Sequence, residues 1–294
     1  MTAPNISLQS NESLRTGLLR VVDELIGSLT TNQSHLSGNG EDIHLVRTTI
    51  KRLRALLRLI RPAIDPAFFN HENDRLRTAA GLLSFARDAE VACRTLKTLP
   101  VSNETDQEAV RSVLSGLETP AQQPKDIQET MAEVNRRLEQ ARLNFHRLKL
   151  RGSDQEILEA GLRAVYRQGR QRMKIAITQD QANAFHRWRI RAKNLYYELQ
   201  FLESVWPKRI DRIVSRLSDL EDQIGRDHDA AVLRAWLKKQ PGTFGGGETV
   251  HRVVACLDDQ TRTLRQKVVP LGLKIWRQKP RRFAQKIVRH WDKR

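Results

Sequence analysis

The sequence predicts an all-α protein. Apolar residues recur every three to four positions along nearly all of its 294 residues, as they do on one face of an α-helix. No stretch shows the sustained alternation of apolar and polar residues, rich in β-branched side chains, that is typical of a strand. The prolines fall at the ends of the periodic segments, where they terminate helices. A chain of this length can bury a core without disulfides or metal.

Periodicity and breaks together predict ten helices. Their expected ranges are 11–30, 41–61, 66–98, 104–117, 126–149, 154–176, 181–204, 208–239, 248–268 and 280–291. Breaks are expected at Pro62, Pro66, Pro100, Pro120, Pro124, Pro207, Pro241, Pro270 and the loop Gly245–Gly247. Ser153, with Glu156 three residues later, matches the capping box that begins a helix. We therefore expect the chain to divide near residue 152 into two halves, 1–151 and 152–294.

Two motifs occur once in each half. The segment His44–Arg54 recurs as His186–Tyr196, with the histidine, the arginine three residues on, the lysine seven on and the leucine nine on in common. Downstream, Phe85–Glu90 recurs as Ile224–Asp229 around a shared Arg-Asp pair, at nearly the same offset along the chain. Two motifs repeated at similar offsets indicate an internal repeat. We expect two four-helix-type bundles related by pseudo-symmetry.

The charge of the chain indicates a polyanionic partner. It has 51 Lys and Arg against 34 Asp and Glu, a net charge of +17, and a pI near 10.5. Nucleic acid, anionic membrane and polyphosphate all fit such an excess. The N-terminus lacks the features of a signal peptide, and no apolar run approaches the roughly 20 residues needed to span a bilayer. We expect a cytoplasmic protein with no membrane partner, in which Cys93 and Cys256 match no zinc or redox spacing.

Three predicted helices carry rows of cations. In the helix 41–61, an apolar seam is formed by Val46, Ile50, Leu53, Leu57 and Ile60. Beside it, about 100° around the helix, a second stripe holds His44, Arg47, Lys51, Arg54, Arg58 and Arg61. The helix 181–204 repeats the pattern, with the seam Trp188, Ala192, Leu195, Leu199 and Leu202 and the stripe His186, Arg189, Lys193 and Tyr196. The helix 154–176 adds the row Arg163, Arg167, Arg170 and Lys174.

Such rows suit a linear ligand with regularly repeated charge. Each helical turn of 5.4 Å offers a fresh donor, arginine binds phosphate oxygens in bidentate fashion, and lysine supplies a mobile charge. Readers of single-stranded nucleic acid usually stack bases on exposed aromatic residues, which make up only 5% of this chain. A single basic face is most often merely solvated. Three rows, two of them in repeated sequence, favour binding.

Metal-dependent chemistry finds little support in the sequence. His44 and His186 have no histidine or carboxylate three or four residues on, so we expect no metal there. Asp88 and Asp227 are expected to cap or pair locally. His228–Asp229 matches the dipeptide of some metal-dependent phosphohydrolases, but without the distant ligands that complete such sites. No Walker loop, HExxH element or GxSxG elbow is present.

In order and spacing, these motifs resemble the CHAD family, a helical domain named for its histidines. The likeness covers roughly 40–294 and rests on 44–58, Tyr166–Arg170, His186–Tyr196, Gln223–Asp229 and 279–291. It implies two bundles around a central basic cleft, binding of inorganic polyphosphate, and a location at polyphosphate granules. Many relatives carry an attached CYTH-type catalytic domain, which is not in this sequence, so we expect no enzymatic activity and no cofactor.

The predicted binding residues come from the matching positions and from the third row. They are His44, Arg47, Lys51, Arg52, Arg54, Arg58, Arg163, Arg167, Arg170, His186, Arg189 and Lys193. Asn194 stands where the first repeat has Arg52, so the second row is expected to bind less strongly. General DNA or RNA binding is the alternative, followed by a metal-dependent phosphohydrolase. Whether a polyphosphate-metabolising enzyme is a further partner stays open.

Overall fold

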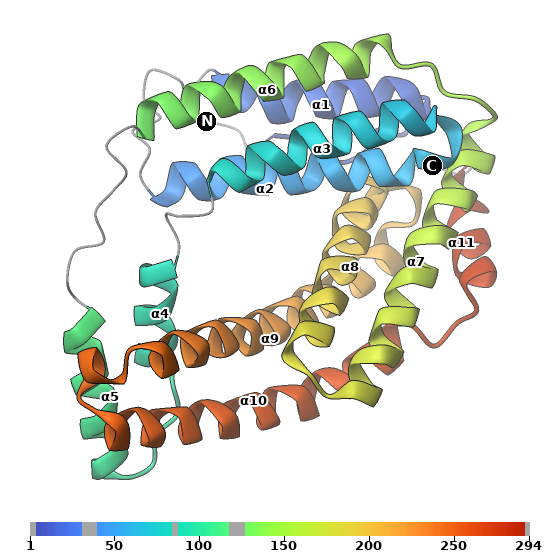
Figure 1. Cartoon of the computed structure of the whole chain (residues 1–294). Helices are drawn as coiled ribbons and strands as arrows, with labels where there is room; N and C mark the ends of the chain where they lie inside the picture. The colour runs from blue at the N-terminus through green and yellow to red at the C-terminus, as the bar shows by residue number, and fades with distance from the viewer. Residues whose placement is uncertain (1–3, 31–39, 84–87, 118–126, 292–294) are drawn as a thin grey trace.

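The structure is a computed structural model that describes residues 4–30, 40–83, 88–117 and 127–291. These residues form eleven α-helices joined by turns and short 3₁₀ segments, and no strand occurs among them (Figure 1). The all-α prediction is confirmed. The helices are α1 (Leu14–Thr30), α2 (Gly40–Leu59), α3 (Pro66–Leu82), α4 (Asp88–Lys97), α5 (Glu104–Leu117), α6 (Ile127–Arg147), α7 (Asp154–Gln179), α8 (Ala182–Phe201), α9 (Pro207–Lys239), α10 (Gly247–Ile275) and α11 (Pro280–Val288).

The single helix predicted over 66–98 is wrong, because the segment forms two helices. α3 ends at Leu82 and α4 begins at Asp88. α3 packs against α2 and α6, whereas α4 packs against α5 and α9, in another part of the molecule (Figure 1). One straight helix cannot serve both partners. Periodicity is a local signal and does not detect this change of neighbours.

The break predicted at Pro270 is also wrong, since α10 continues through it to Ile275. Val268 and Gly272, on either side of the proline, are buried. A Cβ atom at Gly272 would lie 2.5 Å from the Trp188 ring, so glycine allows the helix to approach this ring closely. A proline inside a helix forfeits one backbone hydrogen bond. Burial of the helix on both sides offsets that loss.

α1, α2, α3 and α6 pack together as a four-helix group (Figure 1). The predicted seam of α2 lies at its centre: Val46, Ile50, Leu53, Leu57 and Ile60 are each 0% exposed. With the seam buried, the cationic stripe beside it is turned out of this core. α2 also contacts α7 and α8, so its stripe lies near the second half of the chain.

α7 and α8 pack against each other, with α9 along α8 and α11 against α7. The α8 seam is confirmed as core, since Trp188, Ala192, Leu195, Leu199 and Leu202 are each 0% exposed. The capping box is confirmed as well: Ser153 accepts a hydrogen bond from the Glu156 amide, and the Glu156 carboxylate accepts one from the Ser153 amide at 3.0 Å. One apolar core runs through both groups of helices.

A smaller apolar cluster joins α4 and α5 to the far ends of α9 and α10. Residues 88–117 thus pack on helices of the second half. The division of the chain at residue 152 and the pseudo-symmetry of the halves stay predictions. The expected breaks at Pro120 and Pro124 lie outside the described residues, as do Phe85–Arg87 and the side chains of residues 88–90 in the first copy of the downstream motif.

Candidate functional site

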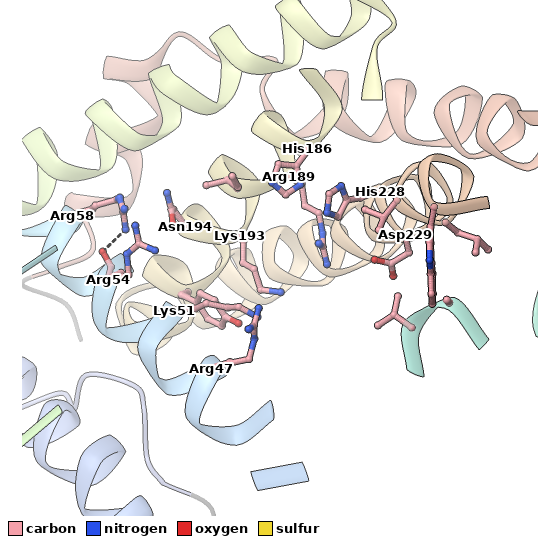
Figure 2. Close-up of a pocket in the computed structure, with 17 residues that line it drawn as sticks. Arg47, Lys51, Arg54, Arg58, His186, Arg189, Lys193, Asn194, His228 and Asp229 are labelled. Carbon is pink, nitrogen blue, oxygen red and sulfur yellow. Dashed lines mark hydrogen bonds between the residues drawn. The ribbon is translucent and has the colours of Figure 1, made fainter. Parts of the chain in front are cut away.

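A cavity of about 520 Å³ lies where α2, α8, α9 and α4 meet. Among the described residues, six lysines and arginines line it, against one carboxylate. The polar residues that line it are Arg47, Lys51, Arg54, Arg58, His186, Arg189, Lys193, Asn194, His228 and Asp229 (Figure 2). The apolar part of the wall comes from Val91 and Ala92 of α4, Ile190 and Tyr197 of α8, and Val232, Leu233 and Trp236 of α9.

The α2 wall is a row of four cations, Arg47, Lys51, Arg54 and Arg58, spaced by four and three residues so that all face the cavity (Figure 2). Hydrogen bonds to neighbouring groups hold three of them, Arg47, Arg54 and Arg58, in place. Arg47 donates to the Leu83 carbonyl at 2.7 Å, and Arg58 donates to the Arg54 carbonyl at 2.8 Å. These contacts fix the side chains without neutralising them.

Asn73 of α3 joins two members of the row. Its Oδ1 atom accepts a hydrogen bond from Arg54 Nε at 3.3 Å and another from Arg58 Nη2 at 3.0 Å. Within the described part of the chain, neither arginine forms an ion pair with a carboxylate. Their acceptors are an amide and a backbone carbonyl, so both guanidinium groups keep their full charge.

Burial makes the charged form of these two arginines less favourable than it would be in water. It lowers the pKa of Arg58 to about 10, helped by the neighbouring charges of Arg54 and Arg191. It also lowers the pKa of Arg54, with Arg77 as the next contributor. Both remain cationic at neutral pH, because even a pKa near 10 lies well above it. An anion entering the cavity would relieve this repulsion.

A buried carboxyl group, Glu198 of α8, lies beneath this wall. It is 0% exposed, and neither of its oxygens has a hydrogen-bond partner among the described residues. Burial raises its pKa well above the ordinary value, although the charge of Arg58 acts in the opposite direction. Burial thus favours its protonated form, and in that form it leaves the charge of Arg58 in place.

The α8 wall is different, because its cations already have an internal counter-ion. Glu221 of α9 accepts a hydrogen bond from Arg189 Nη2 at 3.3 Å and contacts Lys193 Nζ with the same oxygen, Oε1. Gly225, one turn along α9, makes room for Arg189: a Cβ atom there would lie 3.0 Å from Nη2. This gives a structural reason for the glycine that precedes Arg226 and Asp227 in the second copy of the downstream motif.

His186 and His228 meet at the edge of the cavity. Their rings stack with centroids 4.1 Å apart and planes inclined by 30°. Burial, and secondarily the charge of Arg189, lowers the pKa of His186, so its ring is neutral at pH 7. Among the described residues, no group of three or more histidines, cysteines, aspartates or glutamates is placed to hold a metal ion.

The prediction that Asp227 caps or pairs locally is wrong, because its partner lies on another helix. It is 2% exposed and accepts a hydrogen bond from Arg265 Nε of α10 at 3.0 Å. The partner lies on another helix, so the aspartate ties α9 to α10. The spacing within the motif carries no signal for such a distant partner. The corresponding prediction for Asp88 concerns a side chain outside the described residues.

Of the twelve predicted binding residues, seven line the cavity and five lie elsewhere. The seven are Arg47, Lys51, Arg54, Arg58, His186, Arg189 and Lys193. His44 is exposed on the first turns of α2, and Arg52 lies over the Tyr197 ring, 5.7 Å from its centroid. Arg163 and Arg167 are exposed on α7, and Arg170 is half-buried there. A role for these five in binding stays a prediction.

A second cavity of about 350 Å³ shares Arg58 with the first. Its other basic residues are Arg61, Arg172 and Arg191. Burial lowers the pKa of Arg191, with the charges of Arg172 and Arg61 adding to the effect. Arg191 lies within the second copy of the repeated motif but outside its predicted cationic stripe. The side of α7 that bears Arg172 differs from the one that bears the predicted row.

Comparisons with known proteins agree with this architecture. The CHAD domain model matches residues 20–238. The crystal structure of the CHAD domain from the plant Ricinus communis is similar in fold, with a TM-score of 0.63 and 18% sequence identity, over 93% of this chain and 96% of that one. A search of curated proteins finds no significant match. In the described residues, no helix combines the length and apolarity needed to cross a membrane. The family match extends over well more than half of the sequence, and the chain belongs to the CHAD domain family.

Proposed function

We propose that this protein binds inorganic polyphosphate, or a closely similar linear polyanion, along the cationic row of α2, and holds it without performing chemistry on it. The observation that carries the proposal is the state of Arg54 and Arg58. Both face the cavity, both are partly buried, and neither is paired with a carboxylate among the described residues. Partly buried cations without counter-ions are stabilised by an anionic ligand.

The shape of the row favours a chain over a single phosphate. From Arg47 to Arg58 the side chains succeed one another along three turns of α2, and Lys193 faces them from α8 (Figure 2). Arginine offers paired donors to phosphate oxygens at each step. A linear polyphosphate would contact several of these cations at once, which makes each further contact intramolecular.

Charge reversal of the row tests the site. We expect the double variant Arg47→Glu and Lys51→Glu to weaken polyphosphate binding at least about tenfold, or roughly 1.4 kcal/mol. The matched control reverses Arg147 and Lys149, which are exposed near the end of α6 and outside the cavity. Both variants change the net charge equally. A similar loss of affinity in both would show that only net charge matters.

Reversing all four cations shared by the two repeats, including Arg189 and Lys193, would be a harsher test. It would place two new carboxylates beside Glu221, and such a cluster destabilises the fold. The double variant on α2 avoids this complication. The salt dependence of polyphosphate binding by this double variant is a second readout. Loss of two phosphate contacts should make the slope of log affinity against log salt shallower by about 1.4, at about 0.7 per contact.

The same proposal places the protein at polyphosphate granules, with a polyphosphate-metabolising enzyme as a possible companion there. A fluorescent fusion should co-localise with granules and disperse in the α2 double variant. Dispersal of the wild-type protein in cells that contain granules would contradict this part of the proposal. General nucleic-acid binding is the rival, and competition separates the two: polyphosphate should displace bound DNA far better than DNA displaces polyphosphate.

A further inference from the structure

We propose that Glu221 sets the selectivity of the cavity between polyanions, by making the α8 cations available only to ligands of high charge density. This inference rests on the proposed function, because it concerns how the same cavity discriminates. It assigns a role to a residue that does not line the cavity and that no repeated motif contains.

Glu221 contacts two cations of the α8 wall. It lies on α9, its side chain is 11% exposed, and its Oε1 atom contacts both Arg189 Nη2 and Lys193 Nζ. These two cations are themselves only 18% and 22% exposed. One buried carboxylate thus serves two cations that face the cavity. A ligand can engage them fully only by replacing or sharing this carboxylate.

Arg54 and Arg58 on the α2 wall have no such carboxylate partner among the described residues. Arg54 and Arg58 are bound by Asn73 and by a backbone carbonyl, which are neutral acceptors. A hydrogen bond from a cation to a carboxylate adds the attraction between opposite charges, which a neutral acceptor does not supply. An anion therefore meets little competition at Arg54 and Arg58, and strong competition from Glu221 at Arg189 and Lys193. The two pairs of cations differ in the charge density that a ligand needs in order to bind them.

Polyanions differ in their ability to meet that requirement. Consecutive phosphates of inorganic polyphosphate share a bridging oxygen, so several anionic oxygens reach a small volume together. In a nucleic acid strand, a sugar separates consecutive phosphates and the local charge is lower. The denser ligand can bind both Arg189 and Lys193 while it displaces Glu221. The sparser ligand replaces only part of the interaction that these two cations lose with Glu221. Like-charge repulsion from a retained carboxylate then acts against the weaker ligand.

The variant Glu221→Gln tests this directly, since it keeps the shape of the side chain and removes its charge. Wild-type and variant protein are titrated with long-chain polyphosphate and with single-stranded DNA at the same salt. We expect both ligands to bind the variant more tightly and DNA to gain more, so that the preference for polyphosphate narrows by about threefold or more. Asp211→Asn is the matched control: it lies on the same helix, is exposed, and undergoes the same change of charge. The control should leave the preference unchanged.

Each outcome bears on one proposal. If the wild-type protein shows no preference for polyphosphate, the proposed function fails before any variant is made. If it shows the preference and Glu221→Gln leaves it unchanged, the role of Glu221 is refuted even when both affinities rise. Should Glu221→Gln fail to fold by circular dichroism, Glu221→Asp takes its place, because the shorter carboxylate stays in the fold but reaches the cations less well. The same narrowing, smaller in size, is expected, and its absence in a folded Glu221→Asp protein would overturn the inference.

Discussion

Replacing Asn73 by alanine would change how two cavity arginines are held without changing the charge of the protein. The Asn73 Oδ1 atom accepts hydrogen bonds from Arg54 and Arg58, at 3.3 and 3.0 Å, and so orients both toward the ligand. The substitution removes this acceptor and leaves every cation in the chain. It therefore separates the contribution of preorganisation from that of charge.

The magnitude follows from the cost of ordering long side chains. Immobilising one such side chain on binding costs about 0.5–1.5 kcal/mol, so two cost roughly 1–3 kcal/mol. Arg58 keeps its bond to the Arg54 carbonyl in the variant, which limits the loss. We expect the lower half of that range, about 1–2 kcal/mol, which is an affinity about five- to thirtyfold weaker. The slope of log affinity against log salt should stay the same, because the number of phosphate contacts does not change.

The assay is titration with long-chain polyphosphate at several salt concentrations. Asn135→Ala on α6 is the matched control, since Asn135 is half-buried like Asn73 but lines neither the first cavity nor the second. Unfolding in urea checks that both variants keep their stability. Unchanged affinity in Asn73→Ala would refute the claim that the α2 row is preorganised. A reduced salt slope would show instead that a phosphate contact had been lost.

Three further predictions concern buried groups. Because burial raises the pKa of Glu198, the folded protein keeps a proton that the unfolded chain releases, so stability falls as pH rises above the ordinary carboxyl pKa. Glu198→Gln should remove this slope, so in urea unfolding the stability of the variant relative to the wild type should be greater at about pH 8 than at about pH 5. If the variant instead loses stability relative to the wild type at the higher pH, the folded protein holds Glu198 as a charged carboxylate. Gly225→Ala should displace Arg189 and weaken polyphosphate binding severalfold with little change in stability, and unaltered affinity would argue against that contact. The lowered pKa of His186 keeps its ring neutral at pH 7, so acidification adds a cation at the cavity and should tighten binding. His186→Asn should reduce this tightening in titrations across pH, and an unchanged pH dependence would argue against the role of His186.

The helical class and the inward faces of the main helices could be predicted from the sequence, because burial imposes a local period. The seams of α2 and α8 are clear cases, since the residues that recur every three to four positions are those with no exposed surface. The same period fixes which face is left for the cations. Arg47, Lys51, Arg54 and Arg58 were therefore identifiable as a group before any fold was known.

Features that depend on which helices meet could not be predicted in this way. The division of 66–98 into α3 and α4 reflects two different sets of neighbours, and the continuity of α10 through Pro270 reflects burial around Gly272. The acidic residues beneath the walls were missed for the same reason. Glu221 reads as one charge among many on α9, and its partners lie about thirty residues earlier in the sequence, on α8.

The row on α7 shows the limit of arguing from periodicity alone. Arg163 and Arg167 follow the same spacing as the α2 row, yet they are exposed and do not line the cavity. Spacing shows that residues share a face of a helix, and the direction of that face is set by tertiary packing. A solvated basic face and a binding face have the same pattern in sequence.

The most direct test of the account is titration of the purified protein with long-chain polyphosphate at near-physiological salt, with single-stranded DNA of matched total charge as the comparison. We expect polyphosphate to bind at least about tenfold more tightly than DNA, a difference of roughly 1.4 kcal/mol. Equal binding of the two would contradict it, and would mean that the protein responds to net charge and not to the arrangement of cations in its cavity.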